Sequence, residues 1–434
     1  MIKTLETSGI GPAGQMRLEF GSRLNLLTGD NSLGKTFILD IVWWAMTRKW
    51  PAEVNPRLIA GKKAVPPIGQ EGKIAFLFAE KPEGEEYTST FNRREQSWPV
   101  RADRPPFPGL VMYAMSDGSF ALWDPHRNYW AHPSGMDAQK RLPAYVLSQA
   151  EVWDGKRGFD GRSWACNGLL RDWASWQKEN GVQFKHLEQV LAKLSPAPGE
   201  ALCPGSLTRV DLGDARDMPT VHMPYGQDVA VVHASSGVRR ILAIAYMLVW
   251  AWHEHLMAAH LLGEQTAQHI TFLIDEIEAH LHPRWQRCIV KALISAAQSL
   301  GNDAASTNVQ LLASTHSPLV MASVEPLFDP EKDAWFDLDL LRDSQVAKVA
   351  LNKRDFIKQG DASNWLASEA FDLPSGYSLP AEEALNEAAK AMSAESFDAA
   401  QAKALEERLR GVLSDIDPFW IRWRFVAQKK GWAT

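Results

Sequence analysis

Gly29-Asp30-Asn31-Ser32-Leu33-Gly34-Lys35-Thr36 is the stretch that decides the fold class of this chain. It fits the pattern G-x-x-x-x-G-K-[ST] at every fixed position. The apolar residues 24–28 before it predict a short buried strand, and the apolar residues 37–46 after it predict a buried helix. Glycines let backbone N–H groups approach an anion, and a helix N-terminus adds partial positive charge. The stretch therefore predicts an α/β fold with a phosphate-binding loop (P-loop).

The P-loop supplies the first candidate site residues. The Lys35 ammonium would hold the β- and γ-phosphate oxygens of ATP, and the Thr36 hydroxyl would ligate Mg²⁺. A glycine turn that merely enters a helix is the structural alternative. The candidate nucleotide-binding residues here are Gly29, Asp30, Asn31, Ser32, Leu33, Gly34, Lys35, Thr36 and Phe37.

A second motif is the apolar run 269–274 followed by Asp275 and Glu276. Such a run is typical of a strand buried on both faces of a parallel sheet. Carboxylates at its C-terminal end lie where open α/β sheets bind ligands. We expect Asp275 to hold Mg²⁺ and Glu276 to polarise the attacking water. Taken alone, an acidic first turn of a helix explains the pair equally well.

A third motif is the apolar run 309–315, which predicts a further parallel strand ending at His316. Most lone histidines are structural. At the end of a second strand beside the carboxylates, however, His316 occupies the place of a group that senses the γ-phosphate.

The fourth motif is Ser235-Ser236-Gly237-Val238-Arg239-Arg240, followed by an apolar helix from Ile241 to about Trp252. Serine and glycine at a helix entrance leave backbone N–H groups free for an anion, although a simple N-cap has the same composition.

Together the four motifs resemble the ABC/SMC/RecF branch of P-loop ATPases. The segment 275–283, Asp-Glu-Ile-Glu-Ala-His-Leu-His-Pro, closely resembles bacterial "AAA family" ATPases with ABC-type heads. Many of those belong to anti-phage defence operons, including Septu-type and retron-associated systems. The resemblance is specific over residues 1–60 and 230–325.

The resemblance implies a head-to-tail homodimer, or a higher homo-oligomer, with two ATP molecules sandwiched between subunits. It implies that Ser235, Ser236 and Gly237 contact the γ-phosphate of the partner's ATP. It also implies that residues 278–282 couple the two sites and that His316 is a switch histidine. The segment 235–239 lacks the second glycine and the glutamine of the transporter signature, which argues against transport-type kinetics.

A glutamine-loop residue is not obvious. Asp117, within residues 112–118, is a weak stand-in, and Gln70 is a weaker one.

The motif spacing predicts four regions. Residues 1–118 and 225–325 are expected to form two ATPase lobes, 119–224 a helical insertion, and 326–434 a C-terminal region that docks a partner. In that last region we expect a hairpin (334–341 and 345–351), two helices (about 381–392 and 397–415) and a docking helix from 419. The absence of a sustained heptad excludes a long coiled coil.

Bulk properties narrow the setting. The net charge of −6 argues against a protein dominated by nucleic-acid binding but leaves room for local basic patches. No apolar run approaches the roughly 18 residues of a membrane span, and the N-terminus lacks the order of a secretory signal. The 3 cysteines form no CxxC pair, which fits a reducing cytoplasm.

The leading hypothesis is a cytoplasmic ATPase that controls a separately encoded effector, most plausibly a nuclease, in anti-phage defence. The alternative is an SMC/RecF-like DNA repair or maintenance ATPase acting directly on DNA. An intrinsic nuclease is not expected: Asp337 and Asp339 invite comparison with the acids of TOPRIM nucleases, but they alternate with Phe336, Leu338 and Leu340 as in an ordinary strand.

Overall fold

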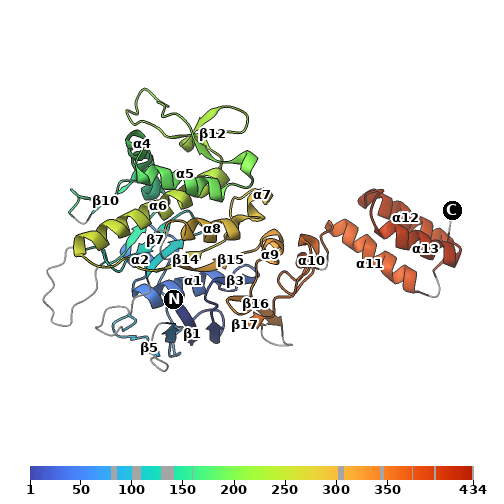
Figure 1. Cartoon of the computed structure of the whole chain (residues 1–434). Coiled ribbons are helices and arrows are strands. Elements are labelled where there is room, and N and C mark those ends of the chain that lie inside the picture. Colours follow the sequence, from blue (N-terminus) through green and yellow to red (C-terminus); the bar gives the residue numbers. More distant parts are fainter. Residues whose placement is uncertain are drawn as a thin grey trace. The chain divides into compact units, whose positions relative to one another are not determined.

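The computed structural model describes residues 1–79, 86–99, 109–128, 141–158, 160–301, 307–342, 347–373, 375–394 and 397–432. These form two compact units, Met1–Ala362 and Ser363–Thr434 (Figure 1).

The centre of the first unit is an eight-stranded sheet in the order β17-β16-β3-β15-β14-β6-β7-β8. Five neighbouring strands, from β16 to β6, run parallel, whereas β17, β7 and β8 are joined by antiparallel pairing. The fold is therefore α/β, as predicted. The strands are β3 (Leu24–Gly29), β6 (Leu110–Ala114), β7 (Phe120–Trp123), β8 (Tyr145–Leu147), β14 (His269–Ile274), β15 (Asn308–Ser314), β16 (Asp333–Arg342) and β17 (Ala347–Arg354).

The parallel register brings the predicted motifs to one edge of this sheet. Leu27 pairs with Ser314, and Ile274 pairs with Ala313, so the three strands end side by side. Strand β14 is buried along 270–274, as its uninterrupted apolar sequence predicted. The P-loop, the two carboxylates and His316 consequently follow three adjacent strand ends.

The sheet also takes strands from outside the two predicted ATPase lobes. Strands β7 and β8 come from the expected insertion, since β7 pairs with β6. The predicted hairpin β16–β17 is present, but it belongs to this sheet because β16 pairs in parallel with β3. The boundaries expected at 118/119 and 325/326 therefore cut across the sheet, and the division between compact units follows Ala362 instead.

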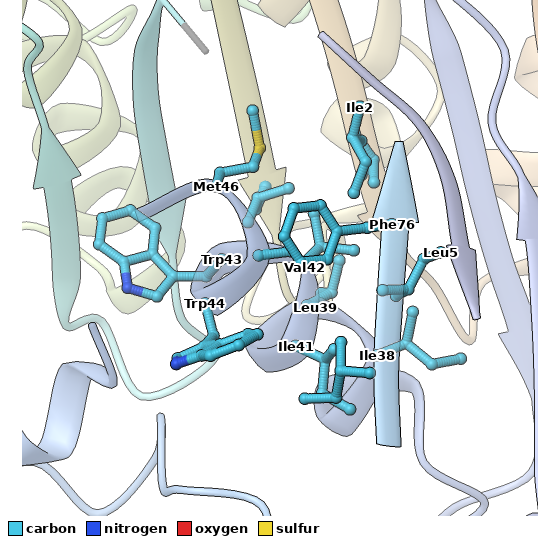
Figure 2. Packing of buried hydrophobic residues seen from close by; sticks show 14 of the residues in the cluster. Ile2, Leu5, Ile38, Leu39, Ile41, Val42, Trp43, Trp44, Met46 and Phe76 are labelled. Atoms are coloured by element: carbon cyan, nitrogen blue, oxygen red, sulfur yellow. The ribbon is translucent and has the colours of Figure 1, made fainter. Parts of the chain in front are cut away.

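Helix α1 (Lys35–Thr47) is held between the large sheet and a second, antiparallel sheet in the order β2-β1-β4-β5. Its apolar side chains meet Ile2 and Leu5 of β1 and Phe76 of β4 (Figure 2). Because α1 is covered on both sides, eleven of its thirteen residues are buried. The second sheet consists of β1 (Ile2–Ser8), β2 (Gln15–Glu19), β4 (Lys73–Phe78) and β5 (Tyr87–Thr90).

On the opposite side of the large sheet lie α6 (Ser236–Leu262), α8 (Ile289–Gln298) and α5 (Val182–Leu194) (Figure 1). Helix α6 is longer than predicted and ends at Gly263, which adopts the left-handed conformation of a C-cap. Contrary to the expectation from the sequence, α6 has the length and apolar composition of a membrane span. However, 72% of its most apolar window is buried inside the protein, as in the core helix of a folded domain.

The remaining elements of this unit are short helices and strands, which include α4 beside α5 and the segments that connect the larger elements. They are α2 (Pro51–Val54), α3 (Gln149–Asp154), β9 (Lys156–Arg157), β10 (Trp164–Cys166), α4 (Leu169–Glu179), η1 (Pro198–Glu200), β11 (Cys203–Pro204), β12 (Thr220–His222), β13 (Asp228–Ala230), η2 (Val231–His233), α7 (Pro283–Gln286) and α9 (Pro318–Val324).

The second unit is a small helical bundle. Its helices are α11 (Leu379–Ser393), α12 (Ala399–Val412) and α13 (Phe419–Lys430), as predicted from the sequence, preceded by α10 (Ala362–Leu366). Its core packs alanines of α11 against Leu405, Leu409, Trp420 and Trp423.

Candidate nucleotide-binding site

The P-loop joins β3 to α1 with the backbone shape that its glycines allow. Gly29 and Gly34 have φ values of 123° and 109°, which disfavour any side chain. A Cβ on Gly29 would also lie 2.2 Å from the Leu338 carbonyl oxygen, and one on Gly34 would lie 2.5 Å from Pro12. Both glycines are thus required by the close approach of neighbouring chain segments. Asp30, Asn31 and Ser32 are exposed at the tip of the loop.

Lys35 is buried, and its ammonium donates hydrogen bonds to carbonyl oxygens of its own loop, those of Gly29 (2.7 Å) and Asp30 (2.8 Å). Burial lowers the pKa of Lys35, while the charge of Asp275 opposes that shift. A cation therefore sits inside the loop, at the place where phosphate oxygens were expected.

The P-loop is tied directly to the end of β14. The Thr36 hydroxyl donates to one Asp275 carboxylate oxygen at 2.9 Å, and the Ser314 hydroxyl donates to the other at 2.7 Å. The Ser314 hydroxyl in turn accepts a hydrogen bond from the backbone N–H of Glu276 at 2.7 Å. The two predicted Mg²⁺ ligands are thus neighbours, and Ser314, whose role was not predicted from the sequence, orients Asp275 and the Glu276 backbone.

Glu278 links the acidic segment to the switch segment. Its carboxylate accepts from the Thr315 hydroxyl (2.7 Å) and from the backbone N–H of His316 (2.6 Å). Burial, and then the charge of Lys35, lower the pKa of His316, so its imidazole is neutral near pH 7. Glu276 is half-buried and has a φ of 49°, a strained value for a side-chain-bearing residue. Lys35, Glu276 and His316 therefore lie close enough for the charges of Lys35 and Glu276 to act on the His316 imidazole.

The predicted signature residues stand apart from this group. Ser235 caps α6, because its side chain accepts a bond from the Val238 N–H, and both Ser235 and Ser236 are exposed. Gly237 is buried, and a Cβ there would lie 2.5 Å from the His280 carbonyl oxygen. Within the described part of the chain, no hydrogen bond joins these residues to the P-loop.

Arg240 is a buried residue whose role the sequence did not reveal. From the first turn of α6, its guanidinium donates to the carbonyl oxygens of Met115 (3.1 Å) and Ser116 (3.2 Å) after β6. It also donates to those of Asp275 (2.9 Å) and Glu276 (3.3 Å) after β14. The start of the signature helix is thereby fastened to the backbone of the acidic segment. The only sequence signal was an arginine one turn into an otherwise apolar helix.

Strand β16 braces the P-loop strand from the other side. The Thr28 hydroxyl donates to Asp337 at 2.7 Å and accepts from the Trp335 indole N–H at 2.7 Å. Asp337 is 1% exposed, so the simple alternation expected of this strand is wrong for it. Its carboxylate is held by Thr28 and lies 3.4 Å from the Arg354 guanidinium, an arrangement that supports the strand.

The two weak glutamine-loop candidates differ in position. Asp117 follows β6, next to the end of β14, and its carboxylate accepts from the Ser119 N–H at 2.9 Å within the turn. Gln70 is exposed, and its carbonyl oxygen accepts a bond from Arg93. Neither role is established by these contacts.

One further acid lies below the site. Asp40 of α1 is 8% exposed and accepts a hydrogen bond from the Tyr113 hydroxyl at 3.0 Å. Burial raises the pKa of Asp40 to about 8, although the bond from Tyr113 opposes the shift.

The donor set fits Mg·ATP. Hydroxyl and carboxylate oxygens are the ligands that Mg²⁺ prefers, and Thr36 and Asp275 already lie within hydrogen-bond distance of each other. A glycine loop at the N-terminus of α1, with a lysine inside it, is a ready cradle for phosphates. Strand, loop, helix and acidic strand end together define a P-loop nucleotide-binding protein.

The family follows from comparison with known proteins. Residues 24–322 match the family described as "AAA domain, putative AbiEii toxin, Type IV TA system". This match covers more than half of the chain, and the chain belongs to that family of AAA-domain ATPases. The predicted resemblance to bacterial AAA family ATPases is confirmed.

Two curated relatives are named as retron ATPases. The chain is 46% identical to the "Retron Vc95 probable ATPase" of Vibrio cholerae serotype O1 biovar El Tor over 52 residues, which are 12% of this chain and 8% of that protein. It is 30% identical to the "Retron Ec83 probable ATPase" of Escherichia coli over 101 residues, 23% of this chain and 14% of that protein. The chain thus matches only a small part of these relatives' length.

Among solved structures, the chain resembles an SMC head bound to the C-winged helix domain of ScpA, with a TM-score of 0.41 and 15% identity over 81% of this chain and 97% of that one. The SMC head domain from Thermotoga maritima gives a TM-score of 0.37 and 15% identity over 82% and 99%. At these scores the resemblance is distant.

Proposed function

We propose that this protein is the ATP-hydrolysing regulator of a bacterial anti-phage defence system, acting in the cytoplasm as an ABC/SMC-type homodimer. The observation that carries the proposal is the 2.9 Å hydrogen bond from Thr36 to Asp275, which joins the P-loop to the acidic segment beside Glu276. Membership of the AAA-domain family and the retron names of two relatives support the defence setting.

In the proposed reaction each side chain has one task. Lys35 exchanges its carbonyl partners for the β- and γ-phosphate oxygens of ATP. Thr36 and Asp275 would hold Mg²⁺, and the ion would supply neutralisation of phosphate charge. Glu276 orients the attacking water, and the neutral imidazole of His316 donates a hydrogen bond to the γ-phosphate.

The proposal assigns Ser235, Ser236 and Gly237 to the partner's nucleotide. Two of them are exposed at the N-terminus of the 27-residue helix α6, whose first backbone N–H groups suit an anion. In a head-to-tail dimer each subunit would then complete the site of the other.

The effector is proposed to be a separately encoded nuclease that docks on the C-terminal region. Helix α13 supports a docking role, because Ile421 and Phe425 lie one turn apart and are 78% and 69% exposed. Exposed apolar side chains of this size mark interaction surfaces when they are adjacent.

The test is the mass in solution of the Glu276→Gln protein, with and without Mg·ATP, alone and co-expressed with the product of the neighbouring gene. We expect this variant to bind ATP, to stall before hydrolysis and to accumulate as dimers that carry the neighbour. The matched control is Lys35→Ala/Glu276→Gln, which should stay monomeric. A Glu276→Gln monomer that ignores ATP would refute the shared-site dimer.

A further inference from the structure

A basic cleft remains outside the site already described. It has a volume of about 540 Å³ and is bounded by residues 49–57 around α2, residues 142–144 before β8, and residues 151–158 at α3 and β9. Four cations and two carboxylates line it: Lys49, Arg57, Lys156, Arg157, Glu53 and Glu151. In a chain of net charge −6, four cations in one cleft are a local reversal of sign.

The two carboxylates are already engaged inside the protein. Glu151 is part of the capping box of α3, accepts from the Asn55 amide at 2.6 Å, and has a side chain only 11% exposed. Glu53 pairs with the Lys63 ammonium at 2.8 Å. Because Lys63 neutralises Glu53 and the buried Glu151 balances one lining cation, the cleft keeps an excess of positive charge.

Two of the four cations, Arg57 and Arg157, are exposed to solvent, whereas Lys49 and Lys156 are half-buried. Arg57 approaches Glu151 at 3.3 Å but leaves 74% of its side chain exposed. The Lys49 ammonium makes no ion pair or hydrogen bond with the part of the chain that the structure describes. Lys156 is held more tightly, since its ammonium donates to the Val146 carbonyl oxygen at 2.6 Å.

The basic surface continues beyond the cleft along β9 and β10. The Arg157 guanidinium lies 3.7 Å from the centre of the Trp164 ring, and that of Arg171 lies 4.4 Å from the same ring. Trp164 itself is 39% exposed. Stacking on an indole fixes the plane of a guanidinium. Arg157 uses one nitrogen, Nη1, to donate to the Arg162 carbonyl oxygen at 3.1 Å and keeps further N–H groups for a phosphate.

We propose that this cleft binds the phosphodiester backbone of a single-stranded nucleic acid. Its cations come from two chain segments, residues 49–57 and 156–157, and Arg171 of α4 extends the charge beyond the cleft, so they suit a run of phosphates better than one small anion. Grooves that track a single strand are lined by cations along its backbone, and here Trp164 positions two of those cations, Arg157 and Arg171. The proposal is independent of the regulator function, because it uses none of the nucleotide-site residues.

The test uses the full chain saturated with ADP, so that the P-loop cannot take up the probe's phosphates. Fluorescein-labelled DNA and RNA strands of about 20 nucleotides are titrated at about 50 and 200 mM salt, and anisotropy reports binding. The variant Lys49→Gln/Arg57→Gln/Arg157→Gln removes three charges and spares Lys156. The matched control, Lys185→Gln/Lys291→Gln/Lys403→Gln, removes three exposed charges elsewhere.

We expect the cleft variant to bind at least about tenfold more weakly at the lower salt, and the slope of log K against log salt to fall by about 2, at 0.7 per lost contact to a single strand. The control should stay within about twofold of the parent. Tighter binding of the DNA or of the RNA probe would identify the sugar as a further contact. Equal affinity for the two probes would support recognition of the phosphate backbone alone.

Three results would overturn the proposal: no binding of either strand, equal loss in the cleft and control variants, or displacement of the strand by inorganic phosphate as readily as by unlabelled strand. If the cleft variant melts several degrees lower than the parent, the double variant Lys49→Gln/Arg157→Gln, which retains the Arg57–Glu151 contact, takes its place. ATP-driven dimerisation, measured separately, distinguishes failure here from failure of the proposed function.

Discussion

The P-loop and the signature segment are both helix entrances that contain glycine, yet the chain treats them in opposite ways. At the P-loop, Lys35 is 6% exposed and Thr36 is bonded to Asp275, so the polar groups have partners in the same chain. At the signature, Ser235 and Ser236 are exposed, and the buried residues begin at Gly237. One entrance is complete within a subunit, while the other presents its serines outward.

This difference suggests that one subunit suffices to bind ATP, whereas two subunits are needed to hydrolyse it. Binding of ATP should depend on the enclosed entrance, whereas hydrolysis in a shared site should depend on both. Variants at the two entrances therefore ought to have different consequences.

The largest effect is expected for Lys35→Ala. Loss of the ammonium removes the charge that would hold the β- and γ-phosphates, and ATP affinity should fall by about 100-fold or more. Isothermal titration calorimetry measures the loss, with the exposed Lys291→Ala as control. Unchanged affinity would refute the P-loop assignment.

Ser236→Arg should separate the two entrances. The bulky cation would obstruct the partner's γ-phosphate but touches nothing in its own P-loop, so hydrolysis should drop about 100-fold while ATP affinity stays within about threefold. Mixing this inactive protein with inactive Lys35→Ala should restore up to about a quarter of the wild-type rate, because each heterodimer has one intact shared site, made by the P-loop of one subunit and the signature of the other. Failure of the mixture to recover activity would argue against head-to-tail sharing.

Arg240→Met probes the connection between the two entrances. Removing the guanidinium leaves buried carbonyl oxygens of the β6 and β14 ends without donors, which should cost about 2–3 kcal/mol of stability in urea unfolding. Since Asp275 and Glu276 lose their backbone anchor, the hydrolysis rate should also fall by more than the ATP affinity does. The neighbouring Arg239→Met, which loses a contact over Trp153, is the control and should have the smaller effect on both.

The smallest effect is expected on the stability of the nucleotide-free protein, for Asp40→Asn in the helix that follows the P-loop. Burial raises the pKa of Asp40 to about 8, so folding requires this carboxyl to take up a proton at neutral pH. The wild type therefore loses stability as pH rises from about 4 to 8, and the asparagine variant does not. The variant's advantage should grow by about 2 kcal/mol between pH 6 and 7.5, measured by unfolding at both values. Asp415→Asn, at an exposed position, should show no such trend.

The sequence was most informative where one short segment contains both the pattern that predicts its secondary structure and the residues of the candidate site. The runs 24–28, 269–274 and 309–315 each predicted a buried parallel strand, since continuous apolar sequence has few other solutions. Strands buried on both faces belong to the middle of a parallel sheet, and these three are indeed neighbours there. Placement of the residues in this site was therefore predictable, while their chemical roles stay predictions.

What the sequence concealed were partnerships between distant segments. Asp337 looked like the solvent face of a strand, but it is buried because Thr28, more than 300 residues away, donates to it. From the sequence, Arg240 looked like part of a helix entrance. In the structure its guanidinium binds four carbonyl oxygens that follow two distant strands, β6 and β14. A local pattern contains no signal for such partners.

The hairpin β16–β17 has a mechanical consequence. Its first strand is hydrogen-bonded along the whole of β3 and presses the Leu338 carbonyl against Gly29, while its second strand ends at Arg354, a short tether before the C-terminal unit begins at Ser363. The segment between them is itself tied to the first unit, because Phe356 stacks on Phe328 at 4.1 Å and the N–H groups of Gln359 and Gly360 donate to Glu325. A pull on the helical bundle would therefore reach Glu325, after α9, before it reached the strands beside the nucleotide loop.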